Sequence, residues 1–212
     1  MRKRVRMARV LIAVPTFENI YPDTYKAIWD MDKGGNEIIF DFVRGYDCAS
    51  ARNNIVQLAK GYQAEYVLMV DNDVTPPRDA LVNLISHREN VVLGYYLHRN
   101  KTNEETFKTC LCKQGEINYT MQYTADELRT MERNGQYLIR IHGGGMGCAL
   151  IRTSVFDRIA YPYYDWVNYN NAQHSLLSED LYFCEQCKHA NIKIFADTRV
   201  GCGHMFRQLK TV

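Results

Sequence analysis

The sequence predicts an α/β fold: a single domain with a mostly parallel central sheet flanked by helices. Three short apolar runs that end at a breaker, at about 9–16, 37–43 and 65–70, are typical of buried strands. Helical patterns fall between these runs. Strands that alternate with helices in this way form parallel βαβ units with right-handed crossovers.

The other elements follow from local signals along the chain. The helices expected in the first half span about 22–33, opened by Pro22, and about 50–60, capped by Ser50 and stopped by Gly61, with a third starting at Thr75-Pro76-Pro77 before strand 91–97. The second half is expected to contain strands at about 105–112, 117–122 and 137–142, a helix from the capping box Thr124-x-x-Glu127 to Gly135, helix 179–190 and strand 192–197. No repeat, linker or low-complexity stretch divides residues 1–212, which indicates one domain.

Composition limits the possible classes of protein. A chain of 212 residues with 46% apolar and 24% charged residues is typical of one globular domain with a buried core. Its longest apolar runs, such as 67–70, are far shorter than the ~20 residues that span a bilayer, and no signal-peptide pattern follows the basic start. The net charge of +2 gives little support to nucleic-acid binding. We therefore expect a cytoplasmic protein without a transmembrane segment.

The seven cysteines are an odd number in a chain long enough to fold without disulfides. This favours free thiols in a reducing compartment. Cys110-x-Cys112 and Cys184-x-x-Cys187 are an alternative set of zinc ligands. The second pair falls in a helical stretch and lacks the usual knuckle setting, so zinc is the weaker interpretation.

Asp71-Asn72-Asp73 follows directly on the apolar strand 65–70. Its carboxylates therefore lie at the carboxyl end of a parallel strand, where open α/β sheets bind ligands. Hard oxygen ligands there suit Mg²⁺ or Mn²⁺ held jointly by the protein and a diphosphate. The alternative is a simple turn or helix cap.

Two further segments fall at the same predicted edge. Thr16 and Glu18 follow the first strand and are candidates to contact a nucleoside, or they belong to an ordinary loop. Arg52, near the start of its helix, is a candidate to face a phosphate or a carboxylate, or it lies in a solvated first turn. The turn Pro15-Thr16-Phe17-Glu18 lacks the glycines of a dinucleotide or Walker loop, which argues against NAD and against a P-loop.

Candidate catalytic and ligand-binding residues also occur in the second half. Ser178-Glu179-Asp180 begins a helix, so its carboxylates serve either as caps or as a general base for an acceptor hydroxyl. His204, in Gly201-Cys202-Gly203-His204 directly after the last predicted strand, is either a metal ligand or an ordinary surface or core histidine. Glycines 143–147 allow close backbone approach to a sugar or form a plain bend. The aromatic run 161–166 is either a stacking platform for a sugar or a loop packed on the core.

The order of these motifs resembles that of the GT-A glycosyltransferases close to family 2, including small stand-alone members. The resemblance rests on strand-Pro-Thr, Ala-Arg-Asn, Asp-Asn-Asp, Gly-x-Gly-Met-Gly-Cys-Ala-Leu-Ile-Arg, Ser-Glu-Asp-Leu-Tyr-Phe-Cys and Gly-His, in that order. It covers about residues 9–206. It implies a GT-A, Rossmann-like domain with a nucleotide-sugar-binding half at about 9–100 and an acceptor half at about 101–206.

The resemblance also implies roles for individual residues. Asp73 and His204 would ligate Mn²⁺ or Mg²⁺, and Asp71 would contact the ribose or a metal-bound water, or join the metal ligands. Asp180 would be the catalytic base, with Glu179 as the nearest substitute. The implied nucleotide and donor pocket is lined by Pro15, Thr16, Glu18, Asp47, Arg52, Asp71, Asn72, Gly145, Met146 and Gly147.

One departure concerns the nucleobase. Many relatives carry an acidic residue soon after the second strand, where this chain has Arg44-Gly45-Tyr46-Asp47. Asp47 is the candidate for that role, and the identity of the base stays open.

The activity implied is hexosyl transfer from a nucleoside diphosphate sugar, with UDP favoured, to a hydroxyl of a glycan, a lipid-linked intermediate, a protein or a small molecule. A single displacement inverts the anomeric centre, and retention stays open. Two alternatives remain: a nucleotidyltransferase that makes a sugar nucleotide, and a carbohydrate-binding or sugar-nucleotide-binding protein without turnover. No nucleic-acid partner is expected.

Overall fold

A seven-stranded mixed sheet lies at the centre of the computed structural model, which describes residues 7–17, 19–98, 108–114, 119, 121–168 and 176–205. The strand order is β2-β1-β3-β10-β5-β13-β8. These strands are β1 (Arg9–Thr16), β2 (Glu37–Arg44), β3 (Tyr66–Val70), β5 (Val91–Tyr95), β8 (Leu138–Ile141), β10 (Cys148–Arg152) and β13 (Ile194–Gly201). Only β10 and β8 run antiparallel to their neighbours. The predicted α/β class with a mostly parallel sheet is confirmed.

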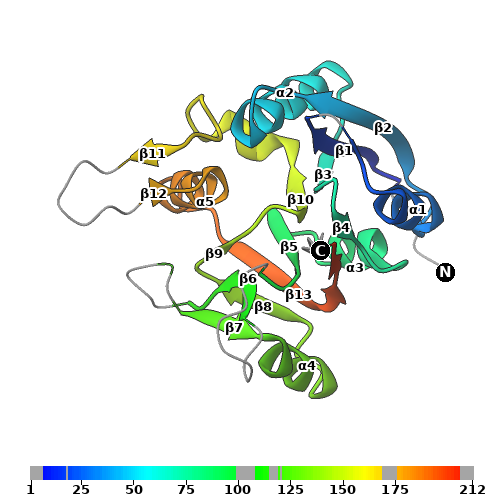
Figure 1. The fold of residues 1–212 in the computed structure, drawn as a ribbon, viewed down its shortest axis with the longest axis vertical. Coiled ribbons are helices and arrows are strands. Elements are labelled where there is room, and N and C mark those ends of the chain that lie inside the picture. The colour runs from blue at the N-terminus through cyan, green and yellow to red at the C-terminus, as the bar shows by residue number, and fades with distance from the viewer. Residues whose placement is uncertain are drawn as a thin grey trace, which may run out of the picture.

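Helices cover the sheet, and three small sheets extend it (Figure 1). The helices are α1 (Pro22–Asp30), α2 (Cys48–Gly61), α3 (Ala80–Ser86), α4 (Ala125–Arg133) and α5 (Glu179–His189), with a 3₁₀ turn η1 (Thr153–Asp157). The small sheets pair β4 (Val74–Thr75) with β14 (Gly203–His204), β11 (Val167–Asn168) with β12 (Leu176–Leu177), and β6 (Lys108–Cys112) with both β7 (Gln122–Thr124) and β9 (Gly143–Gly144). No helix among the described residues is long and apolar enough to cross a bilayer.

The two faces of the sheet are covered by different helices. Successive side chains of a strand point to opposite faces. Phe40 and Phe42 of β2 contact Tyr25 of α1, whereas Asp41 between them lies 3.5 Å from the hydroxyl of Tyr62 at the end of α2. Helices α1 and α2 therefore lie on opposite faces. Strand β3, covered on both sides, is buried at every residue, which explains its uninterrupted apolar sequence.

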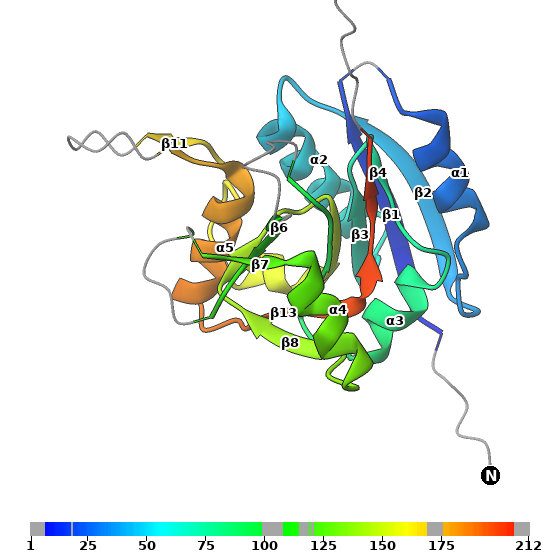
Figure 2. The ribbon, with the colours of Figure 1, turned by 60° about the horizontal axis from the view of Figure 1, so that its bottom comes forward.

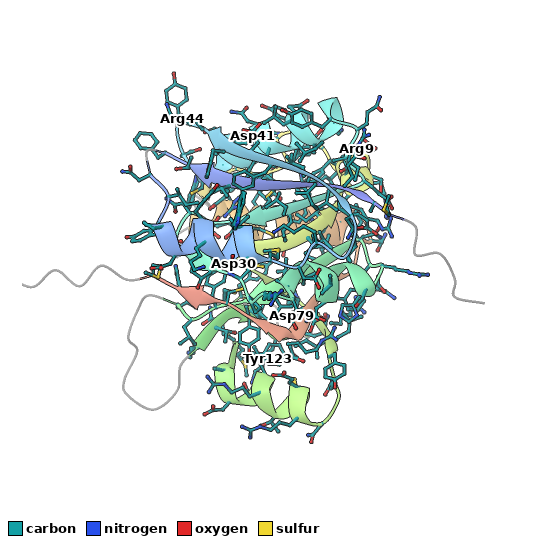
Figure 3. The ribbon with its side chains drawn as sticks, turned by 90° about the vertical axis from the view of Figure 1, so that its right-hand side faces the viewer. Arg9, Asp30, Asp41, Arg44, Asp79 and Tyr123 are labelled. Carbon is teal, nitrogen blue, oxygen red and sulfur yellow. The ribbon has the colours of Figure 1, made fainter. Side chains whose placement is uncertain are left out.

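The carboxyl ends of the first three strands share one edge of the sheet. Strands β1 and β2 are parallel and pair along their whole length, from Arg9 at the start of β1 to Arg44 at the end of β2. Strand β3 is parallel to β1. Figure 3 shows Arg9, at the start of β1, and Arg44, at the end of β2, on opposite sides of the molecule. The residues that follow β1, β2 and β3 therefore lie together on the side of the molecule where Arg44 is found. In open parallel sheets this edge, at the carboxyl ends of the strands, is where ligands bind.

The start of α2 differs from the prediction. The helix begins at Cys48, and Asp47 rather than Ser50 is its N-cap. The Asp47 carboxylate accepts a hydrogen bond from the Ser50 backbone N–H at 2.8 Å, and the Ser50 hydroxyl accepts one from the Asp47 N–H at 3.0 Å. This reciprocal pair is a capping box, so Ser50 is its third helical residue.

Two other predictions needed correction. The helix expected to start at Thr75-Pro76-Pro77 begins at Ala80, because Val74–Thr75 instead extend as β4 to pair with β14. Cys148–Arg152, not predicted as a strand, forms β10 at the centre of the sheet. Of the strand expected at 117–122, only Gln122 is in a strand, β7; residues 119 and 121 are not, and 117, 118 and 120 lie outside the described residues. The capping box at Thr124 is confirmed.

Candidate active site

Asp71-Asn72-Asp73 forms a hydrogen-bonded turn between β3 and β4. The Asp71 backbone carbonyl accepts from the Val74 N–H at 3.1 Å, and the Asn72 carbonyl accepts from the Tyr21 N–H at 3.0 Å. The Asn72 side chain donates to the Asn19 carbonyl at 2.7 Å. The two readings of this tripeptide, a turn and a ligand site, therefore do not exclude each other, because the turn leaves both carboxylates for other partners.

The C-terminal strand brings His204 to Asp73. Strand β14 pairs with β4 in register, with His204 opposite Val74, and Figure 2 shows the two strands side by side. The Met205 N–H donates to the Asp73 carbonyl at 2.8 Å. Nε2 of His204 lies 3.7 Å from Oδ2 of Asp73. Two residues that are far apart in the sequence, both predicted as metal ligands, thus face each other.

The second ring nitrogen of His204 sets the tautomer. Nδ1 lies 2.8 Å from the Leu97 carbonyl oxygen, which can only accept a hydrogen bond. The proton of the neutral ring is therefore assigned to Nδ1, and the lone pair of Nε2 is turned toward Asp73. A ring oriented through its other nitrogen by a carbonyl is the usual arrangement of a metal-binding histidine.

This pair fits a divalent cation in part. An imidazole nitrogen and a carboxylate oxygen suit Mn²⁺, which accepts both donor types. The described residues contain no group of three or more histidine, cysteine, aspartate or glutamate side chains that could hold a metal. Asp73 and His204 would thus hold the ion only together with ligands from outside the protein, such as diphosphate oxygens and water.

Arg52 lies at the centre of a buried cluster of carboxylates. Its guanidinium is 1% exposed and lies 3.0 Å from Asp71, 3.2 Å from Asp180 and 3.7 Å from Glu179. The solvated first turn considered for Arg52 is therefore wrong. Of the two partners expected for Arg52, a phosphate or a carboxylate, the structure shows carboxylates.

The cluster is incompletely hydrogen-bonded. Nη1 of Arg52 and Oδ1 of Asp180 are buried without a hydrogen-bond partner among the described residues. Burial is the largest effect on Asp180 and raises the pKa of its carboxyl from 3.8 to about 7, with Arg52 opposing and Glu179 and Asp71 reinforcing the rise. Unsatisfied buried groups and a carboxyl that titrates near neutrality are typical of functional sites.

The glycine-rich segment connects this cluster to the Asp71 turn. The Gly147 carbonyl accepts from the Asp71 N–H at 3.0 Å, and the Met146 N–H donates to the Asp180 carboxylate. Tyr96 packs beneath: its hydroxyl accepts from the Gly147 N–H at 3.2 Å. A side chain at Gly145 would collide with that hydroxyl, and one at Gly147 would lie 2.8 Å from the ring. Glycine is required at positions 145 and 147 because the backbone there lies too close to Tyr96 for a side chain to fit.

The remaining predicted residues lie around this edge or outside it. Pro15 is buried at the end of β1, and the Thr16 hydroxyl donates to the Asn19 carbonyl at 3.0 Å. The Asp47 side chain caps α2. Glu18 lies outside the described residues.

The sequence offered no signal for two residues of the site. Tyr96 follows apolar residues of a strand, so its sequence position predicts an ordinary core residue. In the structure its ring lies 5.0 Å from that of His204, edge to face. Asn53, quoted only as part of Ala-Arg-Asn, is buried and binds the backbone of Tyr163 and Tyr164. Both act through tertiary contacts that local patterns do not encode.

Comparison with known proteins supports the fold. No protein-family model matches the chain, and no curated protein matches its sequence. Among solved structures, A197 from STIV matches with a TM-score of 0.63 and 15% identity, over 94% of this chain and 86% of that one. GalNAc-T7, solved with UDP, GalNAc and Mn²⁺, matches with a TM-score of 0.64 and 11% identity. That match covers 96% of this chain and 44% of GalNAc-T7.

Identities this low establish the fold and leave the activity to be inferred from the site. The sheet order, the acidic turn after β3 and the two structural matches agree with one another. The chain therefore has the GT-A fold that its sequence predicted.

Proposed function

We propose that this protein is a metal-dependent glycosyltransferase that moves one hexosyl unit from a nucleoside diphosphate sugar to an acceptor hydroxyl. The single observation that carries the proposal is the meeting of Asp73 and His204: Nε2 of the ring lies 3.7 Å from the carboxylate while Nδ1 faces the Leu97 carbonyl. Asp180, in the second half of the chain, contacts Arg52, and Arg52 also contacts Asp71, two residues before Asp73. A metal–diphosphate site and a general base at one sheet edge are the two parts that such a reaction needs.

The donor side is assigned to residues that follow β1, β2 and β3. We assign Asp73 and His204 to the metal, and Asp71, whose carboxylate faces Arg52, to the ribose or a metal-bound water. When bound, Mn²⁺ would neutralise the charge that develops on the leaving diphosphate. The presence of UDP and Mn²⁺ in the structure of GalNAc-T7 supports UDP and manganese as the first nucleotide and metal to test.

The rest of the proposed nucleotide pocket lies around this turn. Pro15, Thr16 and Asn72 lie at the carboxyl ends of the first and third strands and are proposed to border the nucleoside. The Asp47 side chain already caps α2. If Asp47 also recognises the nucleobase, its carboxylate would have to cap the helix and contact the base at the same time. Within the chain, about 9–100 would form the donor half and about 101–206 the acceptor half.

The proposed chemistry is a single displacement with inversion. Asp180 accepts the proton of the acceptor hydroxyl, the acceptor oxygen attacks the anomeric carbon, and the nucleoside diphosphate leaves. Arg52 and the Met146 N–H hold the Asp180 carboxylate in place. Glu179, buried against Arg52, is the substitute if Asp180 is not the base. Gly145–Gly147 lie between donor and acceptor sides in this scheme.

Calorimetry tests the donor site directly. UDP, GDP and their sugar conjugates are titrated into the wild type and Asp73→Asn, with and without Mn²⁺. Binding of one nucleotide that requires Mn²⁺ and is lost in Asp73→Asn supports the proposal and identifies the donor class. If no nucleotide binds under any metal condition, the proposal fails.

The alternatives predict different products. A binding protein without turnover would bind the sugar nucleotide and leave it intact, whereas a transferase slowly hydrolyses its donor when no acceptor is present. A nucleotidyltransferase would release pyrophosphate from a nucleoside triphosphate and a sugar phosphate. Product analysis by chromatography separates all three.

A further inference from the structure

The aromatic run between η1 and β11 divides into a buried part and an exposed part. Tyr163 and Tyr164 are 7% and 1% exposed, whereas Trp166 is 42% exposed. Tyr163 and Tyr164 therefore pack on the core, whereas Trp166 and Tyr161, which is 69% exposed, face solvent, so the two interpretations of the run hold for different residues. A tryptophan side chain gains a large free energy when it is buried, so an exposed Trp166 is a candidate to bind a ligand.

Helix α2 holds this segment in place. The Asn53 side chain accepts from the backbone N–H groups of Tyr163 and Tyr164 at 3.0 and 3.3 Å, and it donates to the Tyr164 carbonyl at 2.8 Å. The Tyr164 ring stacks on Phe183 of α5, with centroids 4.9 Å apart and 13° between the planes. Since Arg52, the preceding residue, holds Asp180, one turn of α2 orders both the segment and the candidate base.

The strand register places Trp166 beside the start of α5. Val167 of β11 pairs with Leu177 of β12, and Asn168 pairs with Leu176, so Trp166 and Ser178 are the next residues toward the body of the protein. Ser178 is the N-cap of α5, and Glu179 and Asp180 follow it. Figures 1 and 2 show β11 and β12 leaving the body of the protein next to α5.

The residue before Trp166 adds a polar group. Asp165 is exposed, and its carboxylate lies near enough to Tyr182 of α5 to raise the pKa of that phenol, although burial is the larger cause. One Asp165 oxygen accepts from the Trp166 N–H at 2.8 Å. An aromatic face beside a carboxylate matches the two surfaces of a sugar ring, its apolar C–H face and its hydroxyl edge.

We propose that Trp166 and Asp165 form the acceptor subsite and that the acceptor is a pyranose sugar, stacked on Trp166 so that one of its hydroxyls reaches Asp180. This inference rests on the proposed function and makes it more specific, because it selects a glycan among the acceptor classes. Lipid-linked carriers and proteins without sugar would not use a rigid aromatic face with a neighbouring carboxylate in this way.

Tryptophan fluorescence tests the subsite without turnover. The chain has two tryptophans, and Trp29 lies on α1, so Trp29→Phe leaves Trp166 as the single reporter. Methyl glycosides of glucose, galactose, mannose and N-acetylglucosamine are titrated in the presence of UDP and Mn²⁺, with glycerol and cyclohexanol as non-sugar controls. We expect a saturable change in emission with at least one glycoside. Trp166→Phe, which keeps Trp29, should show none.

Two results would overturn the subsite. One is the absence of a saturable change with every glycoside in a sample that binds UDP with Mn²⁺. The other is an equal change with cyclohexanol, which would show apolar contact without selection for a sugar. Failure to bind UDP would instead overturn the proposed function, so the two failures are distinguishable.

Kinetics gives a second, independent readout. With the glycoside that changes the emission as acceptor, we expect Trp166→Ala to raise the acceptor KM about tenfold, or ~1.4 kcal/mol. Trp166→Phe should recover part of that loss, because it restores a ring. Trp29→Ala removes an even more exposed tryptophan, at 72%, from a different face and is the matched control. An unchanged acceptor KM in Trp166→Ala would contradict the proposal.

Discussion

The guanidinium of Arg52 lies 3.2 Å from the carboxylate of Asp180 and joins the first half of α2 to the start of α5. The same group also faces Asp71 at the end of β3. Arg52 therefore links the two halves of the candidate site through one buried charge.

We expect Arg52→Met to destabilise the protein strongly at neutral pH. The substitution leaves Asp71, Glu179 and Asp180 without the cation that compensates them, and breaking a buried ion pair costs ~3–5 kcal/mol. The loss should be smaller at pH 5, where Asp180, with a pKa of about 7, is already protonated. Urea denaturation at the two pH values measures the free energy of unfolding.

Lys60→Met is the matched control for this prediction. Lys60 lies on the same helix and pairs with Asp157 at 2.8 Å, but its side chain is 33% exposed. A pair of this kind contributes less than ~1 kcal/mol. Equal effects of the two substitutions would show that burial of Arg52 does not matter.

Transfer activity should rise with pH through about 7. A base must be ionised to accept a proton, and burial raises the pKa of Asp180 to about 7, so the active form accumulates above that value. Asp180→Asn should lower kcat by ~10²–10⁴-fold and remove this limb of the profile. A wild-type profile that is flat from pH 5 to 8, measured by product release at saturating donor, would exclude Asp180 as the base.

The same substitution should stabilise the fold at high pH. The folded pKa of Asp180 is raised from 3.8 to about 7, so between these values the folded state holds a proton that the unfolded state has lost. Stability therefore falls as pH rises through this window. Asn carries no such penalty, and Asp180→Asn should be more stable than wild type by ~1–3 kcal/mol at pH 8 and about equal at pH 4. Thermal melts without metal test this, and a less stable variant at pH 8 would contradict it.

Metal-linked nucleotide binding should depend on His204. We expect His204→Ala to retain the fold and to lose most of the extra melting temperature that Mn²⁺ adds in the presence of UDP, since ligands stabilise only the state they bind. His189→Ala is the control, because His189 is exposed at 77% on α5 and lies 3.9 Å from Glu185. A full Mn²⁺ effect in His204→Ala would remove His204 from the metal site.

The sequence predicted the parallel part of the sheet well and its centre poorly. The runs that became β1, β2 and β3 end in breakers and alternate with helices, which is a local and strong pattern. Cys148–Arg152 is equally apolar but follows a glycine-rich turn without a helix, and only pairing with β3 and β5 makes it a central strand. Antiparallel insertion of this kind is a property of the tertiary fold.

The candidate site shows the same division. The contacts of Asp73 with His204 and of Arg52 with Asp71 and Asp180 agree with the expectation that these residues gather at one site, because acidic or histidine residues follow strands or begin a helix in the order of a known fold; their roles stay predictions. A carboxylate was one of the two partners expected for Arg52, but which carboxylates was not predictable, since nothing in the sequence near Arg52 indicates that the start of α5 will meet α2. Tyr96 was missed for the same reason.

The contact between Gly145 and Tyr96 gives a last prediction, on stability. A methyl group at Gly145 would collide with the Tyr96 hydroxyl, so we expect Gly145→Ala to lower the free energy of unfolding by ~1–3 kcal/mol. Tyr96→Phe alone should cost ~1 kcal/mol, because the Gly147 N–H loses its acceptor. In the double variant the collision is removed, so the total loss should be smaller than the sum of the two single losses.

Gly61→Ala serves as the control, since an added methyl group there meets no atom within 4 Å and should cause no loss. Denaturant titrations of the wild type, the two single variants and the double variant give the coupling free energy between positions 145 and 96. A coupling near zero would mean that the backbone at Gly145 moves away from Tyr96 without cost. Gly145 would then be replaceable. The position of the Met146 N–H against Asp180 would in that case not depend on the close packing of Gly145–Gly147 on Tyr96.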